Sequence, residues 1–565
     1  MPNASIFGSA MRGPAADALN LAGGRAYTVS DDLALAKLAL TSCFNDAFYA
    51  SGELQVTQIV ELANKVRPIF LAKLAVYARK FGYMKDAPAL LLAVLSKRDP
   101  TLYRAAFPLV CDNAKVLRGH VQIMRSGVAG RKSLATAPKS MVGKWFLERS
   151  PWAIFRQSTG NAPTMRDVLR LARVKPDSPE KEAMLRYIVG KELTPEQCTK
   201  LPHDVGVYEA FKKNPVGALP PVPFEFLTSL PLTPEHWKEL ALGMSWQQLR
   251  QSINMLAKNK VFEDTEVTRV IADRLRDPAW IARARVFPYQ LFMSFTATEG
   301  NKDVPQAITL ALQDAMEICA NAFPFCNGRS VVACVDVSGS MHNPVTGNRG
   351  TATTKVTCLN VAALIASVIV RNNNQSVVIP FHDRVVDDQN PLNPRDSIMT
   401  NAKILSRMPQ GGTACSAPIR WLNERGKKPD VVFMLSDSES WADYNPGTGN
   451  HSSFLWTPTG PRSIGPTGLH HEWQVLKKRH PTAQLILCDL QPNKTAQVMP
   501  ASDVLFLNGW SDRMFETVED FVKLGPAHNG ALLSQIESIT FERPTRSAQA
   551  DKSTDIEIVP LDQAE

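Results

Sequence analysis

Three oxygen-bearing side chains follow one another at every second position near the middle of the chain. Asp336, Ser338 and Ser340 come directly after an apolar run, Val331 to Val335, which has the character of a buried strand. Mg²⁺ takes oxygen ligands in near-octahedral geometry and usually keeps several waters. Open α/β sheets bind ligands at the carboxyl ends of their strands. The spacing therefore predicts a magnesium site on the loop after this strand.

Two later residues support this interpretation. Thr413 lies in the Gly-rich stretch GGTACS, and Asp437 follows the apolar run of DVVFMLSD. A bare Asp-x-Ser-x-Ser is a weak signal, since its serines could cap a helix and its aspartates could form turns. The complete set in this order resembles the metal-ion-dependent adhesion site of von Willebrand factor A domains. That resemblance implies a divalent cation, most simply Mg²⁺, with the ligands Asp336, Ser338, Ser340, Thr413 and Asp437.

Positive charge is concentrated in one stretch of the chain. Residues 115–175 hold 13 Lys and Arg but 2 Asp and Glu, whereas the net charge of all 565 residues is only +9. A surface that serves solubility alone mixes both signs. Such a local excess predicts a surface that binds phosphate.

A short helix is predicted to carry the centre of this charge. Thr164 and Asp167 have the spacing of a capping box, with Asp in the place of Glu or Gln, so a helix should start there. Arg166, Arg170 and Arg173 follow at i, i+4 and i+7 and are expected to form one cationic stripe. Guanidinium groups bind phosphate bidentately. The candidate nucleic-acid-binding residues are Arg131, Lys132, Lys139, Lys144, Arg156, Arg166, Arg170 and Arg173.

Four aromatic residues are interleaved with these cations: Trp145, Phe146, Trp152 and Phe155. Stacking of a base on such a ring contributes about 1–3 kcal/mol. Each ring taken alone is better explained as helix core, and the cations as a solvated face. The arginines as a group favour nucleic acid.

The surrounding pattern predicts two kinds of architecture. From residue 31 to about 320, apolar residues recur at spacings of three and four residues, which predicts a series of helices with short breaks. Antiparallel pairs of helices, each pair about 40 residues long, resemble a HEAT-type solenoid. From Arg329 onward, short apolar strands alternate with helices, which predicts a mainly parallel, doubly wound sheet. The expected parts are a loosely packed arm (1–30), a helical domain (31–325), an α/β domain (326–543) and a tail (544–565).

Composition excludes several classes of protein. The chain is 44% hydrophobic and 21% charged, which is typical of a soluble globular protein, and it has no apolar run of about 18 residues or more. Its nine cysteines are scattered, form no C-x-x-C, and fit a reducing cytoplasm, so a cytoplasmic location is expected. We find no P-loop, no G-x-S-x-G, no H-E-x-x-H and no second carboxylate cluster. The chain is therefore predicted not to be an enzyme.

Several separate motifs resemble the Ro autoantigen family, in which a so-called TROVE domain, a ring of HEAT-like helices, is joined to a von Willebrand A domain. The similarity covers roughly residues 30–540, and a bacterial or phage member is expected. The stretches that carry it are YARKFGYMKDAPALLLAVL (Tyr77–Leu95), SGVAGRKSLATAPKSMVGKWF (Ser126–Phe146), MRDVLRLARVKP (Met165–Pro176) and RVFPYQL (Arg285–Leu291).

The resemblance implies a non-catalytic, RNA-binding ribonucleoprotein. Family members bind small structured Y RNAs on a basic outer face and take single-stranded 3′ ends of misfolded RNA through the ring. Bacterial relatives work with an exoribonuclease in RNA maturation, decay or quality control. A ring closed by one chain predicts a monomer, and no membrane is expected as a partner. Two positions depart from the family pattern, Ala414 in place of Asp and Met165 in place of His.

An alternative function remains open at this stage. The metal could capture an Asp or Glu of a partner protein, with the helical half acting as its scaffold. The concentrated charge of residues 115–175 favours RNA over this alternative.

Overall fold

The computed structural model divides the chain into two compact units. Unit 1 comprises residues 1–55 and 272–535, and unit 2 comprises residues 56–271 and 536–565. The structure describes residues 14–160, 162–284, 288–321, 325–326, 328–348, 355–387, 390–443, 454–457, 460–463, 465–509, 513–524 and 531–541. The predicted tail (544–565) and the start of the predicted RVFPYQL motif lie outside these residues. Within them, no helix has the length and apolar character needed to cross a bilayer.

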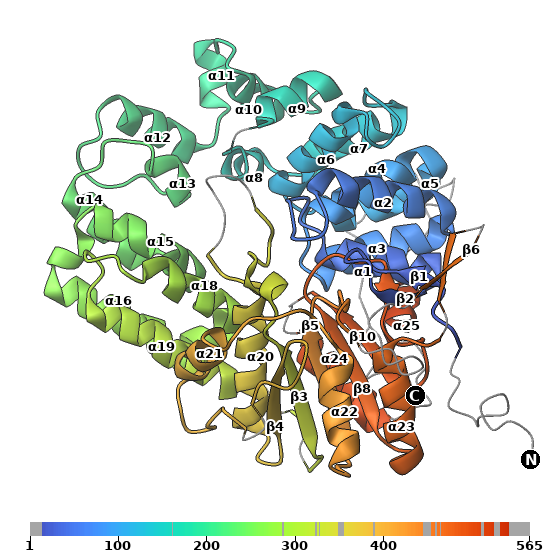
Figure 1. Cartoon of the computed structure of the whole chain (residues 1–565). Helices are drawn as coiled ribbons and strands as arrows, with labels where there is room; N and C mark the ends of the chain where they lie inside the picture. Colours follow the sequence, from blue (N-terminus) through green and yellow to red (C-terminus); the bar gives the residue numbers. More distant parts are fainter. Residues whose placement is uncertain are drawn as a thin grey trace, which may run out of the picture. The chain divides into compact units, whose positions relative to one another are not determined.

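A five-stranded parallel sheet forms the centre of unit 1 (Figure 1). Its order is β10-β8-β5-β3-β4, and all four pairings are parallel. All five strands are almost wholly buried, as expected for a sheet with helices on both faces. The strands are β3 (Val331–Asp336), β4 (Val377–Phe381), β5 (Val431–Ser436), β8 (Gln484–Asp489) and β10 (Val504–Asn508). The predicted strands are confirmed.

The strand order reverses beside β3. The chain passes from β3 to β4 on one side and then returns to β5 on the other side. In open α/β sheets, ligands bind outside the carboxyl ends of strands at such a reversal of order. The connecting helices are α20 (Cys358–Asn372), α21 (Ile398–Ser406), α22 (Ser416–Glu424), α23 (Gly468–Arg479) and α24 (Arg513–Leu524). Short elements of the same unit are η2 (Gly339–His342), β6 (Phe454–Thr457) and β7 (Gly460–Ser463).

The N-terminal residues pack into unit 1, so the expectation of a loosely packed arm is wrong for residues 14–30. β1 (Ala18–Leu19), β2 (Arg25–Thr28) and β9 (Thr495–Ala496) form an antiparallel sheet. Ala26 and Tyr27 are buried. The Gly/Ala-rich composition suggested a mobile segment, but the small side chains allow the backbone to approach closely. Residues 1–13 lie outside the described part.

Helices that the sequence pattern grouped with the helical half also belong to unit 1. α18 (Pro288–Thr298) and α19 (Gln306–Asn321) contact α20, and α17 (Pro278–Ala284) contacts α19. α1 (Asp31–Thr41) starts at Ser30, whose side chain accepts from the amide of Leu33, and it contacts β10. The compact units therefore divide the chain at other residues than the predicted boundary at 325.

Unit 2 is helical, and many of its helices contact near neighbours in sequence. α3 contacts α4 and α5, α4 contacts α5 and α6, and α7 contacts α5 and α9 (Figure 1). The helical fold class is thus confirmed, while HEAT repeats and closure into a ring stay predictions. The elements are α2 (Gly52–Lys65), α3 (Pro68–Lys80), α4 (Asp86–Arg98), α5 (Pro100–Val110), α6 (Ala114–Ser126), α7 (Thr136–Leu147), α8 (Pro151–Arg156), α9 (Met165–Ala172), α10 (Pro179–Val189), α11 (Pro195–Thr199), α12 (His203–Lys213), α13 (Phe224–Leu227), α14 (Pro234–Gly243), α15 (Trp246–Lys258), η1 (Val261–Glu263) and α16 (Thr265–Arg276). α2 and α16 cross the boundaries between the units, as does α25 (Ala531–Glu537).

A buried ion pair ties α1 to the sheet of unit 1. Lys37 Nζ lies 2.9 Å from Asp489 Oδ2. The Lys37 side chain is 1% exposed and the Asp489 side chain 2% exposed, so both are as buried as apolar core residues. The ammonium also donates to the carbonyl of Thr495. Asp489 ends β8, so this contact fixes the N-terminal helix beside the carboxyl end of the sheet.

We expect Lys37→Met to lower the opening free energy of α1 by about 3–5 kcal/mol, because it leaves the Asp489 carboxylate buried without its cation. Native-state hydrogen exchange of the α1 amides measures this directly. Lys403→Ala is the control, since it removes only the exposed pair with Glu299 and should cost less than about 1 kcal/mol. Equal exchange in the two variants would contradict the role of the buried pair.

Candidate nucleic-acid interface and metal centre

The predicted helix start at Thr164 is confirmed. Thr164 is the N-cap of α9, and its backbone amide and hydroxyl donate to Asp167 Oδ2 over 2.9 and 2.7 Å. The Asp167 amide in turn donates to the Thr164 hydroxyl. These hydrogen bonds lower the pKa of Asp167. Asp167 is therefore committed to the cap of α9.

α9 presents two arginines to solvent, and the predicted stripe of three is wrong at its last member. Arg166 and Arg170 are exposed, while Met165 and Val168 are buried. α9 ends at Ala172, and Arg173 is its C-cap in the left-handed region with φ 53°. The helical spacing cannot extend to Arg173 because its backbone leaves the helix there. Pro176, three positions after Arg173, is a signal that a helix ends nearby. The prediction gave this signal less weight than the helical spacing of the arginines.

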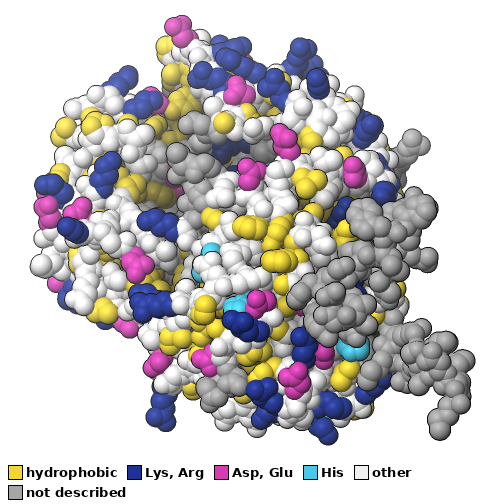
Figure 2. Space-filling model, in the orientation of Figure 1, with side chains coloured by type: hydrophobic (Ala, Val, Ile, Leu, Met, Phe, Trp, Pro, Cys, Tyr) yellow, Lys and Arg dark blue, Asp and Glu magenta, His cyan; other side chains and the backbone are white. Residues whose placement is uncertain are grey.

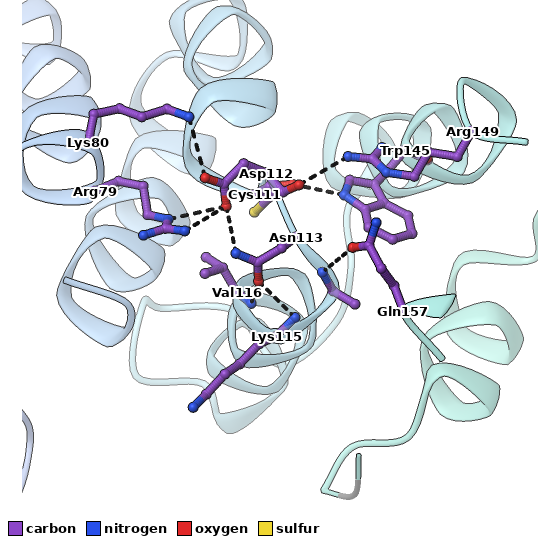
Figure 3. Close-up of polar contacts among 11 residues, drawn as sticks. Arg79, Lys80, Cys111, Asp112, Asn113, Lys115, Val116, Trp145, Arg149 and Gln157 are labelled. Carbon is purple, nitrogen blue, oxygen red and sulfur yellow. Dashed lines mark hydrogen bonds and ion pairs between the residues drawn. The ribbon is translucent and has the colours of Figure 1, made fainter. Parts of the chain in front are cut away.

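Asp112 joins the helices that carry the basic segment (Figure 3). Arg79 donates to its Oδ1 from Nη2 over 2.9 Å, and Lys80 reaches its Oδ2 over 3.3 Å. Asn113 donates to the same carboxylate over 2.9 Å and caps α6. One half-buried carboxylate thus fixes the end of α3 against the turn between α5 and α6.

Trp145 and Arg149 complete this joint from α7 and its end. The Trp145 indole donates to the carbonyl of Cys111 over 2.8 Å, and the Arg149 guanidinium lies 3.8 Å from the Trp145 ring centroid (Figure 3). Arg149 also donates to the carbonyl of Asp112. Burial lowers the pKa of Arg149. Arg149 is therefore a structural cation and is not free to bind phosphate.

The aromatic residues of the basic segment belong mainly to the core. Trp145, Phe146 and Phe155 are buried, as the simpler interpretation predicted, and Trp152 is half-buried. Phe155 stacks on Phe226 with ring centroids 4.4 Å apart. Trp145, Phe146 and Phe155 therefore hold the helices together and are not free platforms for bases.

The other predicted cations lie at scattered places on the surface of unit 2. Arg131 is half-buried in the turn between α6 and α7, while Lys132, Lys139 and Arg156 are exposed. Lys144 pairs with Glu148 over 3.2 Å, which partly neutralises it. Figure 2 shows Lys and Arg side chains gathered at the top of the view, over α9 and α10 of Figure 1.

Arg166 and Arg170 line a cavity that sequence reasoning missed. It measures about 930 Å³ and is bounded by α9, the end of α10 and α12. Tyr187, Tyr208 and Phe226 contribute aromatic surface. The remaining predicted cations do not line it. The aromatic members and the acids Glu192 and Glu209 come from residues 187–226, beyond the basic segment, so the charge count of that segment gave no signal for them.

Of the five predicted metal ligands, Asp336, Ser338, Ser340 and Asp437 lie at the carboxyl ends of β3 and β5, and Thr413 lies on the loop between α21 and α22. All five side chains are buried. The hydroxyls of Ser338 and Ser340 are 3.2 Å apart. Gly339 donates to the carbonyl of Gly411 over 3.2 Å, and Trp441 donates to the carbonyl of Thr413. Backbone hydrogen bonds thus connect the loops that carry Ser338, Thr413 and Asp437.

The carboxylates of this group repel one another in the absence of a cation. Burial, with the neighbouring Asp437, raises the pKa of Asp336 to about 7, and burial also raises the pKa of Asp437. Asp437 Oδ2 is buried and has no hydrogen-bond partner within the described residues. Asp336 Oδ2 accepts from Ser436 over 2.6 Å. An orphaned carboxylate oxygen beside two hydroxyls fits a hard divalent cation.

Polar residues that the sequence analysis did not select surround the predicted metal ligands. Glu439 is buried, accepts from the amide of Ala22, and has its pKa raised by burial to about 8. The Tyr49 hydroxyl interacts with Ser340.

Lys37, within the apolar run LALAKLAL, was a usable sequence signal for a buried acidic partner, which is Asp489. The backbone amide of Ala414 donates to the carbonyl of His382, so the departure from the family pattern leaves this loop hydrogen-bonded.

The fold and the residues at its sheet edge define a class of protein, a helical unit combined with a von Willebrand A-type domain. A family model described as the Ro60 vWA domain matches residues 329–448. The Ro (Rsr) protein of Deinococcus radiodurans has a similar fold, with a TM-score of 0.57 and 18% identity, covering 87% of this chain and 99% of that one.

Two relatives named RNA-binding protein RO60 are similar in sequence. The one from Deinococcus radiodurans is 25% identical over 465 residues, 75% of this chain and 83% of the relative. The one from Caenorhabditis elegans is 25% identical over 201 residues, 34% of this chain and 30% of the relative. The resemblance to the Ro family that the sequence motifs indicated is confirmed.

We expect Asp112→Ala to lower the free energy of unfolding of unit 2 by about 2 kcal/mol, because hydrogen bonds to charged groups contribute about 1.5–3 kcal/mol and Arg79 and Lys80 lose their counter-charge. Chemical denaturation measures the loss. Glu148→Ala is the matched control: it makes the same charge change in the same region but breaks only the exposed pair with Lys144. A loss no larger than in the control would contradict the role of Asp112 as a joint.

Proposed function

We propose that this protein is a non-catalytic RNA-binding scaffold of a ribonucleoprotein, acting in the cytoplasm. The observation that carries the proposal is the unpaired positive charge of residues 115–175. Apart from Lys144, none of the predicted cations forms an ion pair with an acidic side chain in the described part of unit 2, and Asp167 interacts with Arg166 and Arg170 only at longer range. The similarity to proteins named RNA-binding protein RO60 supports RNA as the polyanion.

The finer assignment follows the Ro family. We propose a small, structured, Y-like RNA as the main ligand, bound by Arg131, Lys132, Lys139, Lys144, Arg156, Arg166, Arg170 and Arg173. Misfolded RNA with a single-stranded 3′ end is the second ligand, and an exoribonuclease is the partner in RNA maturation, decay or quality control. The protein acts as a monomer. Arg166 and Arg170 are the strongest of these candidates, because they share one cavity.

We expect the triple variant Arg166→Ala, Arg170→Ala, Arg173→Ala to bind a hairpin RNA with a 3′ single-stranded tail more weakly and with a shallower salt dependence. Each phosphate contact contributes about 0.7–0.9 to the slope of log K against log salt, so the slope should fall in magnitude by about 2–3. Filter binding at several salt concentrations measures it. The melting temperature should stay unchanged, because all three side chains are exposed.

A second triple variant controls for net charge. Lys403→Ala, Lys427→Ala and Lys428→Ala remove three exposed cations of unit 1 and should leave the slope almost unchanged. Equal slopes for both triple variants, or a wild-type protein that barely binds, would refute the RNA interface.

We also propose that Asp336, Ser338, Ser340, Thr413 and Asp437 hold Mg²⁺. The orphaned oxygen of Asp437 is the specific observation that favours it. When bound, the cation supplies an electrophilic coordination position for a carboxylate of a partner protein. Trp441 lies beside this group and is 53% exposed, so an apolar contact is available next to the cation. This metal-dependent protein interaction is the alternative function, with the helical unit as its scaffold.

We expect Asp437→Asn to raise the melting temperature of the metal-free protein and to abolish its response to Mg²⁺. The substitution removes a buried carboxylate that faces Asp336, yet it also removes a ligand. Binding at 100 times the dissociation constant stabilises a native protein by about 2.7 kcal/mol, so the wild type should respond clearly. Calorimetry with Mg²⁺, against NaCl at equal ionic strength, measures both effects. A wild-type protein without response, or a variant with the full response, would contradict the site.

A further inference from the structure

The cavity beside α9 has the size and the walls of a site for one small organic anion. Ligand pockets in proteins measure about 300–1,000 Å³, and this cavity of about 930 Å³ lies within that range. One wall is α9, with Arg166 and Arg170. The opposite wall is α12, with Tyr208, Glu209 and Lys212, and Phe226 adds apolar surface.

The α9 wall carries two arginines and one acid, Asp167, so its net charge is positive. Asp167 is used in the helix cap, as described above. Arg166 lies against Gly190, where even a Cβ atom would come within 2.6 Å of its Nη2. Arg118 packs on Gly160, another cavity residue, and its Nη1 is buried without a hydrogen-bond partner in the described chain. A phosphate on this wall would accept hydrogen bonds from the guanidinium groups of Arg166 and Arg170.

The opposite wall offers aromatic surface and one carboxylate. The Tyr187 hydroxyl and Lys212 both donate to Oε1 of Glu209, each over 2.5 Å. No hydrogen bond to Oε2 of Glu209 occurs among the described residues, so this oxygen can accept from a ligand. Phe226 and Tyr208 pack edge to face with ring centroids 5.5 Å apart. This wall therefore suits a flat ring that carries N–H donors.

We propose that the cavity binds one unpaired guanine nucleotide of the RNA, with its phosphate on Arg166 and Arg170 and its base against the aromatic wall. Unstacked bases of RNA are commonly read by aromatic side chains and by hydrogen bonds to their Watson–Crick edge. Guanine presents two neighbouring N–H donors on that edge, which Glu209 accepts. Uracil offers one donor between two carbonyls, which the carboxylate repels. The assignment rests on the proposed RNA binding and adds a base-specific contact to it.

Saturation-transfer NMR titrations with GMP, AMP, CMP and UMP test the assignment on the full chain. We expect GMP to bind at least tenfold more tightly than UMP. Arg166→Ala with Arg170→Ala should weaken all four nucleotides, because the phosphate contact is common to them. Glu209→Gln should remove the preference for GMP, while Tyr187 and Lys212 keep an oxygen acceptor. Glu182→Gln, on the exposed part of α10 and outside the cavity, should leave the preference unchanged.

Parallel filter binding of the tailed hairpin RNA separates the two proposals. Glu209→Gln should not reduce the salt slope of RNA binding, since it removes no cation. If the RNA binds with the expected salt slope but no mononucleotide binds, the cavity assignment is overturned and the RNA interface stands. If GMP binds no better than UMP, or if Glu209→Gln keeps the preference, the base contact is overturned. If neither RNA nor mononucleotides bind, RNA binding itself is refuted.

Discussion

Like-charge repulsion is the constraint around which unit 2 is built. The 61 residues from 115 to 175 carry 13 cations and 2 acids, so ion pairs within this segment cannot hold it together. Apolar packing does so instead, through the buried faces of α6, α7 and α9 and through the stacked rings of Phe155 and Phe226. A half-buried acidic contact comes from Asp112, just before the segment, and it engages Arg79 and Lys80 of α3. Within the segment, Lys144 and Arg149 are engaged by the protein itself, and the exposed cations without an ion pair in the described structure are left for a ligand.

Unit 1 contains the same kind of imbalance with the opposite sign. Asp336 and Asp437 are buried together, and of the two further buried acids nearby, Glu439 and Asp489, only Asp489 has a lysine beside it. Buried like charges raise each other's pKa and are typical of functional sites. A divalent cation is the simplest compensation, just as phosphate is the simplest compensation in unit 2. Each unit thus tolerates repulsion at the place where a ligand of opposite charge fits.

The sequence was a good guide wherever local patterns decide the structure. Five apolar strands and the capping box at Thr164 follow from periodicity and short motifs, and the structure has them. Contacts between segments distant in sequence could not be predicted from these local patterns. The Lys37–Asp489 pair joins residues 452 positions apart, and the cavity combines α9 with residues 187–226. The place of Arg173 outside the helical stripe was missed because its left-handed backbone is a local feature that helical spacing does not reveal.

Lysine footprinting tests the central claim, that the basic segment of unit 2 is the RNA interface, most directly. Acylation of the full chain is compared with and without saturating hairpin RNA, and each lysine is quantified by mass spectrometry. We predict strong protection of Lys132 and Lys139, with unchanged reactivity at Lys403 and Lys428 of unit 1. Protection spread evenly over all exposed lysines, or confined to unit 1, would contradict the account.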